Sequence, residues 1–280
     1  MALTINTNVS SLFAQQYLAQ SQQGLSDTLQ RLSSGLRINN ASDDPAGLAI
    51  SQTMQANIGG LNQGSRNGQT GVDMVQTAQG AMQTILSDLQ LMNQLAVQAS
   101  NGTNSASNLK NLDTEYQALL NEVSRVGSTT NFNGVSVLGG GSISIQIGAG
   151  AGAGNQISVT LTNTSAGTAG LNIAGSKLYD GSTNANTDAL AAITSLSSSI
   201  SSVTTGLATL GADSANLQAA IQSNDSFSTN LSAAKSSIVD ADYAAESSNL
   251  AKYNILNQSD VAMLAQANSA PALVLQLLKQ

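Results

Sequence analysis

Histidine, cysteine and tryptophan are absent from this chain of 280 residues, and each absence excludes a kind of site. Without cysteine there is no disulfide framework, no thiolate nucleophile and no thiolate metal site. Without histidine the commonest general base and metal ligand is missing. Carboxylate-only sites remain open, for example at Asp43/Asp44 or Asp240/Asp242, although each pair also lies where a helix start or a polar face would place it. The sequence therefore predicts a non-enzyme with no cofactor and no metal site.

Charge and aromatic side chains are scarce as well. Charged residues make up 9% of the chain and aromatic residues 3%, against about a quarter charged in an ordinary domain. The surface must then be coated mainly with Ser, Thr, Asn, Gln and Gly. A chain with so few charges has weak electrostatic protection against self-association. Two interpretations are open, a neutral secreted protein or a self-associating one, and the apolar stripes described below favour the second.

The nine Lys and Arg residues are scattered, and the net charge is −7. Without a basic patch, the chain is expected to bind neither nucleic acid nor an anionic membrane. The first residues, MALTINTNVSSLF, lack the basic and apolar regions of a signal peptide. No apolar run approaches the roughly 18–20 residues of a membrane span. Composition alone would place the protein in the cytoplasm.

What the chain does have is heptad-type apolar spacing, which brings a narrow stripe of one helix against a partner helix. The stripes are Leu18, Gln22, Leu25, Leu29, Leu32 and Leu36; Val75, Ala78, Met82, Ile85, Leu89, Met92 and Ala96; Leu109, Leu112, Tyr116, Leu119, Val123 and Val126; and Ile193, Leu196, Ile200, Val203, Leu207, Leu210, Ser214, Leu217 and Ile221. Together with residues that cap or break helices, these stripes predict helices over residues 8–35, 71–100, 109–127 and 187–223. A further helix is predicted to start at Pro45 and to weaken at Gly59-Gly60. The last is predicted to run from 226 to the end, with a kink at Pro271.

The middle of the chain alternates with period two. Ile143, Ile145 and Ile147 are followed by a Gly/Ala loop and then by Ile157, Val159 and Leu161, which predicts a β-hairpin. Asn133-Gly134 predicts a tight turn, and residues 163–186 are expected to be loop-like, with at most one more short strand. The fold class is mainly α: long coiled-coil-like helical hairpins or a bundle from both termini, with a small β-rich insert in the middle.

The C-terminus is unusually apolar, because Leu273, Val274, Leu277 and Leu278 form i,i+4 pairs. These side chains are expected to be buried, either in the chain's own core or between subunits. Long helices at both ends that hold a β-rich insert describe the building block of a polymer better than an enzyme.

Both ends of the chain resemble bacterial flagellin. The matching segments are residues 5–8, 29–39 (LQRLSSGLRIN), 41–50 (ASDDPAGLAI), 95–98, 132–134, 238–244 (IVDADYA) and 262–268 (AMLAQAN), within a resemblance that covers roughly 1–140 and 190–280. The middle shows no such match.

The resemblance implies a filament subunit in five segments: an N-terminal inner-tube helix (1–43), the two halves of a helical core domain (44–140 and 188–244), a variable outward β-rich insert (141–187) and a C-terminal inner-tube helix (245–280). It implies type III export without cleavage and an extracellular filament. The implied partners are copies of the chain, an export chaperone, the filament cap and hook-junction proteins. The polymerisation interface is expected at Leu25, Leu29, Leu32, Leu36, Leu264, Leu273, Val274, Leu277 and Leu278.

The resemblance also implies a segment read by Toll-like receptor 5, here Leu91, Leu95, Gln98 and Glu115. Many flagellins carry charged residues where this chain has Leu91 to Gln94, so weak recognition is expected. Two alternatives to a filament subunit follow from the same resemblance. A hook–filament junction protein shares the terminal helices. A flagellin with a zinc protease in its insert would need histidine, which this chain lacks.

Overall fold

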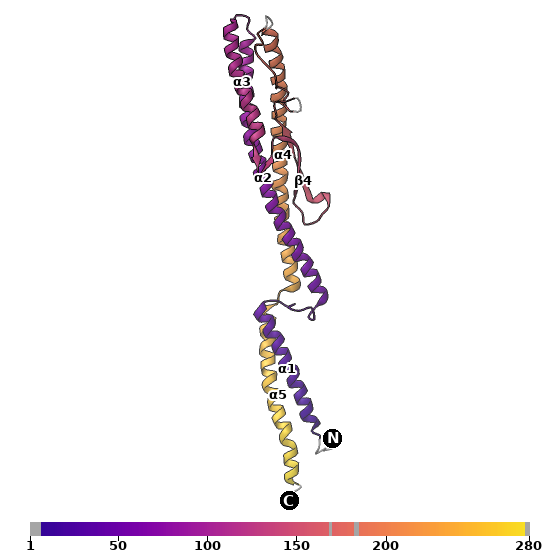
Figure 1. The fold of residues 1–280 in the computed structure, drawn as a ribbon. Coiled ribbons are helices and arrows are strands. Elements are labelled where there is room, and N and C mark those ends of the chain that lie inside the picture. The colour runs from indigo at the N-terminus through magenta and orange to yellow at the C-terminus, as the bar shows by residue number, and fades with distance from the viewer. Residues whose placement is uncertain (1–6, 168–169, 182–184, 278–280) are drawn as a thin grey trace. The chain divides into compact units, whose positions relative to one another are not determined.

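The computed structural model describes residues 7–167, 170–181 and 185–277, leaving out the side chains of 185–186 and 270–277. The chain divides into two compact units. We call residues 1–56 with 230–280 the helix-pair unit and residues 57–229 the bundle unit. In chain order the elements are α1 (Val9–Ser34), α2 (Pro45–Ala99), α3 (Ala106–Thr129), β1 (Asn131–Phe132), β2 (Val135–Ser136), β3 (Gly139–Gln146), the 3₁₀ helix η1 (Ala153–Asn155), β4 (Gln156–Asn163), α4 (Ala185–Val239) and α5 (Tyr243–Leu277) (Figure 1). The predicted fold class is confirmed.

The first helix begins and ends where the sequence predicts. The Asn8 side chain accepts a hydrogen bond from the Ser11 backbone N–H at 3.1 Å, which satisfies one of the free donors of the first turn. Gly35 ends α1 with φ of 71°, a left-handed conformation that costs glycine little. The start of α2 is also as predicted, because the Asp44 carboxylate accepts the Gly47 N–H at 2.9 Å and Pro45 occupies the first helical position.

The two connections of the helix-pair unit are joined by a short antiparallel bridge between Leu36 and Asp240. The Arg37 N–H donates to the Val239 carbonyl at 2.7 Å, and the Ala241 N–H donates to the Gly35 carbonyl at 2.9 Å. These bonds satisfy backbone groups at the end of α1 and after α4, where no helical partner is available.

The prediction that α2 weakens at Gly59-Gly60 is wrong, because α2 is one helix of 55 residues. Its glycines serve packing. A Cβ atom on Gly64 would lie 1.6 Å from the Ile147 carbonyl oxygen, and one on Gly71 would lie 2.3 Å from Ile145. The helix tolerates the low propensity of glycine because the β-hairpin lies against its backbone at these positions.

The predicted break at 223–226 is also wrong. Helix α4 continues through it to Val239, and Asn224 is buried there with its amide donating to the Ile147 carbonyl at 2.9 Å. The break falls at 240–242, where the Asp242 carboxylate caps α5 by accepting the Ala244 N–H at 2.9 Å. Helix α5 continues past Pro271 to Leu277.

In the bundle unit, α2, α3 and α4 lie side by side (Figure 1) and bury the predicted stripes. The fully buried members, with no more than 1% of their surface exposed, include Val75, Ala78, Met82, Ile85, Leu89, Met92, Tyr116, Val123, Leu196, Val203, Leu210 and Leu217. Alternate positions such as Leu112, Ile193 and Leu207 are half-buried at the edges. This core is continuous and apolar, so the hydrophobic effect stabilises it without help from neighbours.

The predicted hairpin is confirmed, with β3 antiparallel to β4 in a register that sets Ile143 opposite Val159 and Ile145 opposite Ile157. The turn at Asn133 and Gly134 is confirmed too, since both have positive φ between the paired strands β1 and β2. The hairpin joins the helices instead of standing apart from them, because Val159 and Leu161 belong to the helical core.

The segment after β4 is loop-like as expected, and its described part, 164–167 and 170–181, contains no further strand. It still contributes to the core through Leu171, Ile173 and Leu178. The Leu178 N–H donates to Asp113 at 2.7 Å, and Ser199 donates to the Leu171 carbonyl at 2.7 Å, so the loop is bonded to both α3 and α4.

Candidate polymerisation surface

Helices α1 and α5 lie antiparallel and contact each other along most of their length (Figure 1). On α1 the buried and half-buried positions with heptad spacing are Ser11, Ala14, Leu18, Ser21, Leu25, Thr28 and Leu32. On α5 they are Glu246, Leu250, Tyr253, Asn257, Asp260, Leu264 and Ala267. Both sets follow the alternating three-and-four spacing of a coiled coil. We call this contact the seam.

The seam mixes apolar and polar residues, and six of its fourteen positions are polar: Ser11, Ser21, Thr28, Glu246, Asn257 and Asp260. Ser21 donates to the Asp260 carboxylate at 2.8 Å, and Ser11 donates to the Asn268 side-chain carbonyl at 2.7 Å. Arg31 pairs with Glu246 at 3.3 Å, where the Glu246 side chain is only 10% exposed. A seam of this kind excludes little apolar surface from water, so it contributes much less hydrophobic stabilisation than the bundle core.

Of the six residues in the predicted stripe on α1, four are half-buried, Leu18 among them, and two are exposed. Leu25 and Leu32 are half-buried at the seam, and Leu36 is half-buried just after α1, but Leu29 is 49% exposed and Gln22 is exposed. Small hydroxyl side chains, Ser21 and Thr28, occupy the intervening seam positions. The stripe follows the alternating spacing of the leucines from Leu18 to Leu36, and this spacing selects Gln22 and Leu29 instead of these neighbours.

Of the predicted C-terminal interface residues, Leu264 is half-buried at the seam. The side chains of Leu273, Val274 and Leu277 lie outside the described residues, although the backbone there is helical, and Leu278 lies outside entirely. Sequence reasoning missed the polar members of the seam. Their signal was the heptad spacing itself, read without regard to hydrophobicity.

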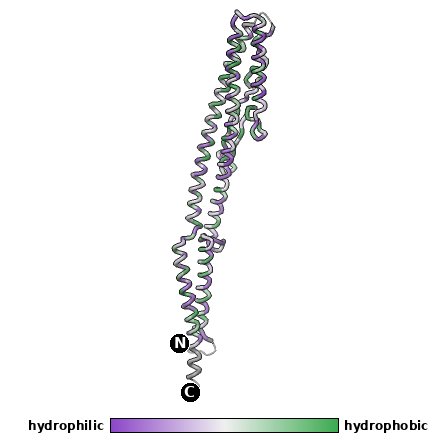
Figure 2. Tube along the Cα trace, turned by 90° about the vertical axis from the view of Figure 1, so that its left-hand side faces the viewer, coloured by the Kyte–Doolittle hydropathy of each residue, from purple (hydrophilic) through white to green (hydrophobic). Residues whose placement is uncertain are grey.

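Large apolar side chains lie on the outside of the pair. Counted along the heptad, Val9, Leu12 and Phe13 fall on the side of α1 opposite the seam and are 51–56% exposed. On α5, Ile255 lies opposite the seam and is 64% exposed. The exposed residues Leu256, Val261 and Met263 lie on α5 at the sides of the seam. Figure 2 shows hydrophobic residues interspersed with hydrophilic ones along both helices. The pair thus exposes two apolar surfaces that face away from each other, an outer α1 surface and an outer α5 surface.

The same end of the pair is uncharged. Helix α1 has no charged residue before Asp27, and α5 has none between Asp260 and its end at Leu277. Identical copies could pack against the outer α1 surface, and against α5 beyond Asp260, without bringing like charges together. Apolar surface of this extent and neutrality is typical of a contact with other protein chains.

The residues of the predicted receptor segment are divided between surface and core. Leu91 is 41% exposed on α2, and Gln98 and Glu115 are exposed. Leu95 is 7% exposed and belongs to the core of the bundle unit. Three of the four residues are therefore accessible. Leu95 supports α2, which carries Leu91 and Gln98, whereas Glu115 lies on α3.

The carboxylate pairs that the sequence left open have local structural roles. Asp43 accepts the Asn39 and Asn40 N–H groups at 2.9 Å each. The bond from Asn40 is the largest cause that lowers the pKa of Asp43, followed by the bond from Asn39. Asp44 and Asp242 cap helices, and Asp240 accepts a hydrogen bond from Ser236. Within the described residues, no group of three potential ligands could hold a metal ion.

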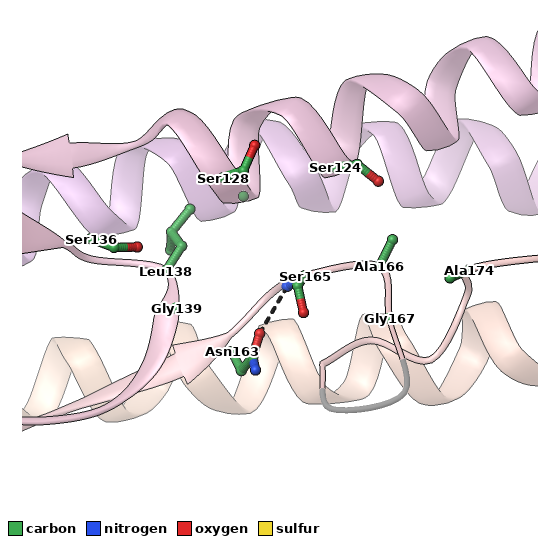
Figure 3. A pocket seen from close by; sticks show the side chains of 11 residues that line it. Ser124, Ser128, Ser136, Leu138, Gly139, Asn163, Ser165, Ala166, Gly167 and Ala174 are labelled. Atoms are coloured by element: carbon green, nitrogen blue, oxygen red, sulfur yellow. Dashed lines mark hydrogen bonds between the residues drawn. The ribbon is translucent and has the colours of Figure 1, made fainter.

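A pocket of about 470 Å³ lies in the bundle unit beside α3 (Figure 3). Serine hydroxyls of Ser124, Ser128 and Ser136 line it, and the Ser165 N–H donates to Asn163 at 3.0 Å. The described residues that line it are Ser, Gly, Ala, Leu and Asn, and none of these has a side chain that acts as a general base near neutral pH. Among the described helices, none is long and apolar enough to cross a membrane.

Comparison with known proteins supports the assembly role. Residues 5–142 match the bacterial flagellin N-terminal helical region, and residues 190–278 match the bacterial flagellin C-terminal helical region. Flagellin of Halalkalibacterium halodurans is 40% identical over 277 residues, 99% of this chain and 100% of its own length. Flagellin of Listeria innocua is 37% identical over 285 residues, with 99% of each chain covered. The crystal structure of Bacillus cereus flagellin is similar over 57% of this chain and 88% of its own, at 28% identity and a TM-score of 0.47.

The two matched regions contain α1 and α5, which form the helix pair, and also the three helices of the bundle unit. The relatives above are flagellins across nearly their whole length, so the hook–filament junction alternative gains no support. This chain belongs to the bacterial flagellin family.

Proposed function

We propose that this chain polymerises with copies of itself into the helical filament of the bacterial flagellum and there transmits the torque of the motor. The observation that supports this proposal most strongly is the pair of apolar surfaces that face away from each other, with Phe13 exposed on α1 and Ile255 exposed on α5. A closed two-fold dimer would cover one such surface and leave the other in water. Two surfaces facing apart require at least two neighbours for each copy, which is the condition for an open-ended polymer.

Two of the segment boundaries expected from the sequence lie beside helix starts, which supports them. Helix α2 begins at Pro45, next to the boundary at 43/44, and α5 begins at Tyr243, next to the boundary at 244/245. We assign 1–43 and 245–280 to the inner tube, because there the apolar side chains lie outside the pair. We assign 44–140 and 188–244 to the surrounding helical layer, because much of this sequence already has a core of its own. Residues 141–187 form the outward segment.

The interface residues follow from the same argument. Of those expected from sequence, Leu29 is the best candidate on α1 since it is exposed. Leu25, Leu32, Leu36 and Leu264 act mainly by supporting the pair. Leu273, Val274, Leu277 and Leu278 are assigned to the interface on their sequence pattern alone. Val9, Leu12, Phe13 and Ile255 join the interface on the basis of their exposure.

The remaining assignments follow from family membership. We place the assembled protein outside the cell, exported by the flagellar type III apparatus, with an export chaperone, the filament cap and hook-junction proteins as further partners. We assign the chain a structural role and no catalytic one. Its carboxylate pairs serve helix ends and loops, which is consistent with that role.

Toll-like receptor 5 is proposed as a weak partner. Leu91 presents an exposed apolar side chain where an Arg would offer charge-assisted hydrogen bonds. In receptor-reporter cells, monomeric Leu91→Arg should signal more strongly than the parent. Val97→Arg is the matched control, because Val97 is also exposed on α2 and lies outside the proposed residues. Equal signalling by the parent and Leu91→Arg would remove this position from the recognition site.

Seeded polymerisation tests the main proposal. The double substitution Leu12→Gln/Phe13→Gln removes two exposed apolar side chains from the outer α1 surface. If burial of each contributes about 1.5–3 kcal/mol, the critical concentration should rise on the order of 100-fold or more. The control, Gln15→Ala/Gln16→Ala, changes two exposed polar residues of the next turn and should change it little. Electron microscopy and sedimentation would measure both. An unchanged critical concentration for the first variant would contradict the proposal.

A further inference from the structure

The apolar part of the seam does not by itself define how far α1 is slid along α5. Leu18, Leu25 and Leu32 recur every seven residues on α1. A slide by one heptad, about 10.5 Å at 1.5 Å per residue, would place each leucine where the previous one had been. On α5, Leu250 and Leu264 repeat in the same way at twice that spacing. Apolar contacts alone would therefore favour several registers almost equally.

The polar contacts distinguish between these registers. They link α1 to α5 at three levels: Asn8 and Ser11 with Ala267 and Asn268, then Ser21 with Asp260, then Arg31 with Glu246. At the first level the Asn8 amide donates to the Ala267 carbonyl at 2.7 Å. The three levels are spread along most of the pair, and no two of them use the same pair of residue types. A one-heptad slide would set Ser21 beside Tyr253 in one direction or beside Ala267 in the other. Either slide would separate Glu246 from the Arg31 guanidinium.

Shape restricts the register at a further point. A Cβ atom on Gly24 would lie 2.4 Å from the Tyr253 ring, so the ring occupies the space that a side chain would otherwise take. Gly24 is the only glycine of α1. Any slide would move the Tyr253 ring against a residue that does have a side chain.

We propose that the polar residues of the seam fix the axial register of α1 against α5, and that this register aligns the outer apolar surfaces for assembly. The second half of this inference rests on the proposed polymerisation. A buried polar residue in a coiled coil is known to specify register while it lowers stability. In the native register Ser11 lies beside Asn268 and Ser21 beside Asp260. This register therefore sets the axial distance between the exposed apolar residues of α1, Leu12 and Phe13, and those of α5, Val261 and Met263. A slipped pair would offset these surfaces in each copy, and its neighbours could not bury both.

The register can be measured directly because the chain contains no cysteine. Ser11→Cys/Asn268→Cys places two thiols together in the native register, and Ser11→Cys/Val261→Cys places them together after a one-heptad slide. A short thiol–thiol crosslinker then reports the population of each register in monomers and in filaments. The two reporters are read in three backgrounds: the parent, Ser21→Leu/Asp260→Leu, and the matched control Asn257→Leu. Asn257 is a polar seam residue, but its amide donates to the Tyr253 carbonyl of its own helix.

In the parent background we expect native crosslinks to exceed slipped ones by about tenfold or more, since a slide leaves buried polar groups unpaired. Ser21→Leu/Asp260→Leu should bring the ratio below about threefold, even where the added leucines make the pair more stable. Asn257→Leu should leave the parent ratio unchanged. Ser21→Leu/Asp260→Leu without reporters should elongate filament seeds poorly.

Three results would overturn the inference. The first is an unchanged ratio in Ser21→Leu/Asp260→Leu, which would make the polar pairs merely stabilising. The second is the same loss of ratio in Asn257→Leu, and the third is the absence of native crosslinks from parent monomers and filaments alike. Failure of the unsubstituted parent to elongate seeds would instead contradict the proposed function, while the crosslink ratio in monomers would still decide the register.

Discussion

The bundle unit and the helix-pair unit are both built from long helices with heptad spacing, yet the bundle unit buries apolar side chains between its helices, whereas the helix pair mixes half-buried leucines with polar residues. In the bundle unit the residues between the helices include Met82, Leu89 and Leu210, which are fully buried. In the helix-pair unit the buried seam positions hold Ser21, Thr28 and Glu246. Other large apolar residues of the pair, such as Phe13 and Ile255, lie outside the seam and are exposed.

The difference separates folding from assembly. A unit with an apolar core is stable as one chain, because burial within that chain offsets the loss of conformational entropy. A pair that leaves its apolar residues exposed gains most of its stabilisation from neighbours. The same heptad spacing thus serves a fold in one unit and a polymer contact in the other.

The strongest test of this difference removes residues 271–280. The lost segment contains Leu273, Val274, Leu277 and Leu278, which should contribute about 1.5–3 kcal/mol each to subunit contacts. Polymerisation should be abolished, as seen by electron microscopy, while the thermal unfolding of the bundle unit should not change. Normal filaments from the shortened chain would show that the C-terminus is not part of the contact.

A matched pair of leucine substitutions compares the core of the bundle unit with the seam of the helix pair in the monomer. Leu89→Ala empties a fully buried site and should cost about 2–5 kcal/mol of unfolding free energy in the bundle unit. Leu25→Ala, at a half-buried site of the seam, should cost less than about 1 kcal/mol. Urea unfolding followed by circular dichroism gives both values. Equal losses would mean that the seam is as strong as the core.

A pair of glycine substitutions tests why α2 tolerates glycine. Gly64→Ala would place its methyl group 1.6 Å from the Ile147 carbonyl oxygen, and should destabilise the bundle unit by about 1–3 kcal/mol. Gly59→Ala meets nothing within 4 Å, and should stabilise the helix by about 0.5–1 kcal/mol. The two substitutions are chemically identical, so effects of the same sign would refute the packing explanation.

The smallest expected effect concerns a carboxylate in the bundle unit. Burial, and to a lesser extent the Glu122 carboxylate, raises the pKa of Asp88, and its Oδ2 atom has no hydrogen-bond partner among the described residues. A carboxyl group with a raised folded-state pKa makes the folded state bind more protons, so stability falls as pH rises through that pKa. Asp88→Asn should raise the melting temperature slightly at neutral pH, and the gain should disappear in acid. Asp73→Asn, on an exposed carboxylate of α2, is the control.

The sequence predicted the parts of the fold that apolar periodicity determines. The stripes on α2, α3 and α4, the hairpin of β3 and β4, and the helix starts near Asn8 and at Pro45 are confirmed. It misplaced features that depend on tertiary contacts. Gly59-Gly60 suggested a weak point in α2, but a Cβ atom on Gly60 would lie 2.5 Å from Ala149. This close approach is a tertiary contact that is not visible in a single helix.

The polymerisation surface was harder to predict for a related reason. An apolar stripe indicates that a helix has a partner but not which partner, its own chain or a neighbour. Leu29 belongs to the predicted stripe but is exposed beside the seam, whereas Ser21 and Thr28, which lie outside the stripe, are buried there. Hydroxyl side chains carry no apolar signal, so only the structure separates the seam between α1 and α5 from the surfaces left for other copies.

Hydrogen exchange on the monomer and the filament tests the central claim most directly. In the monomer, backbone amides of the bundle unit such as that of Leu89 should be strongly protected, while those of Leu25 and Leu264 in the helix pair should exchange quickly. In the filament all three should be protected, because neighbouring copies cover the outer surfaces of the pair. Strong protection of the Leu25 and Leu264 amides in the monomer would contradict the claim that assembly stabilises this unit.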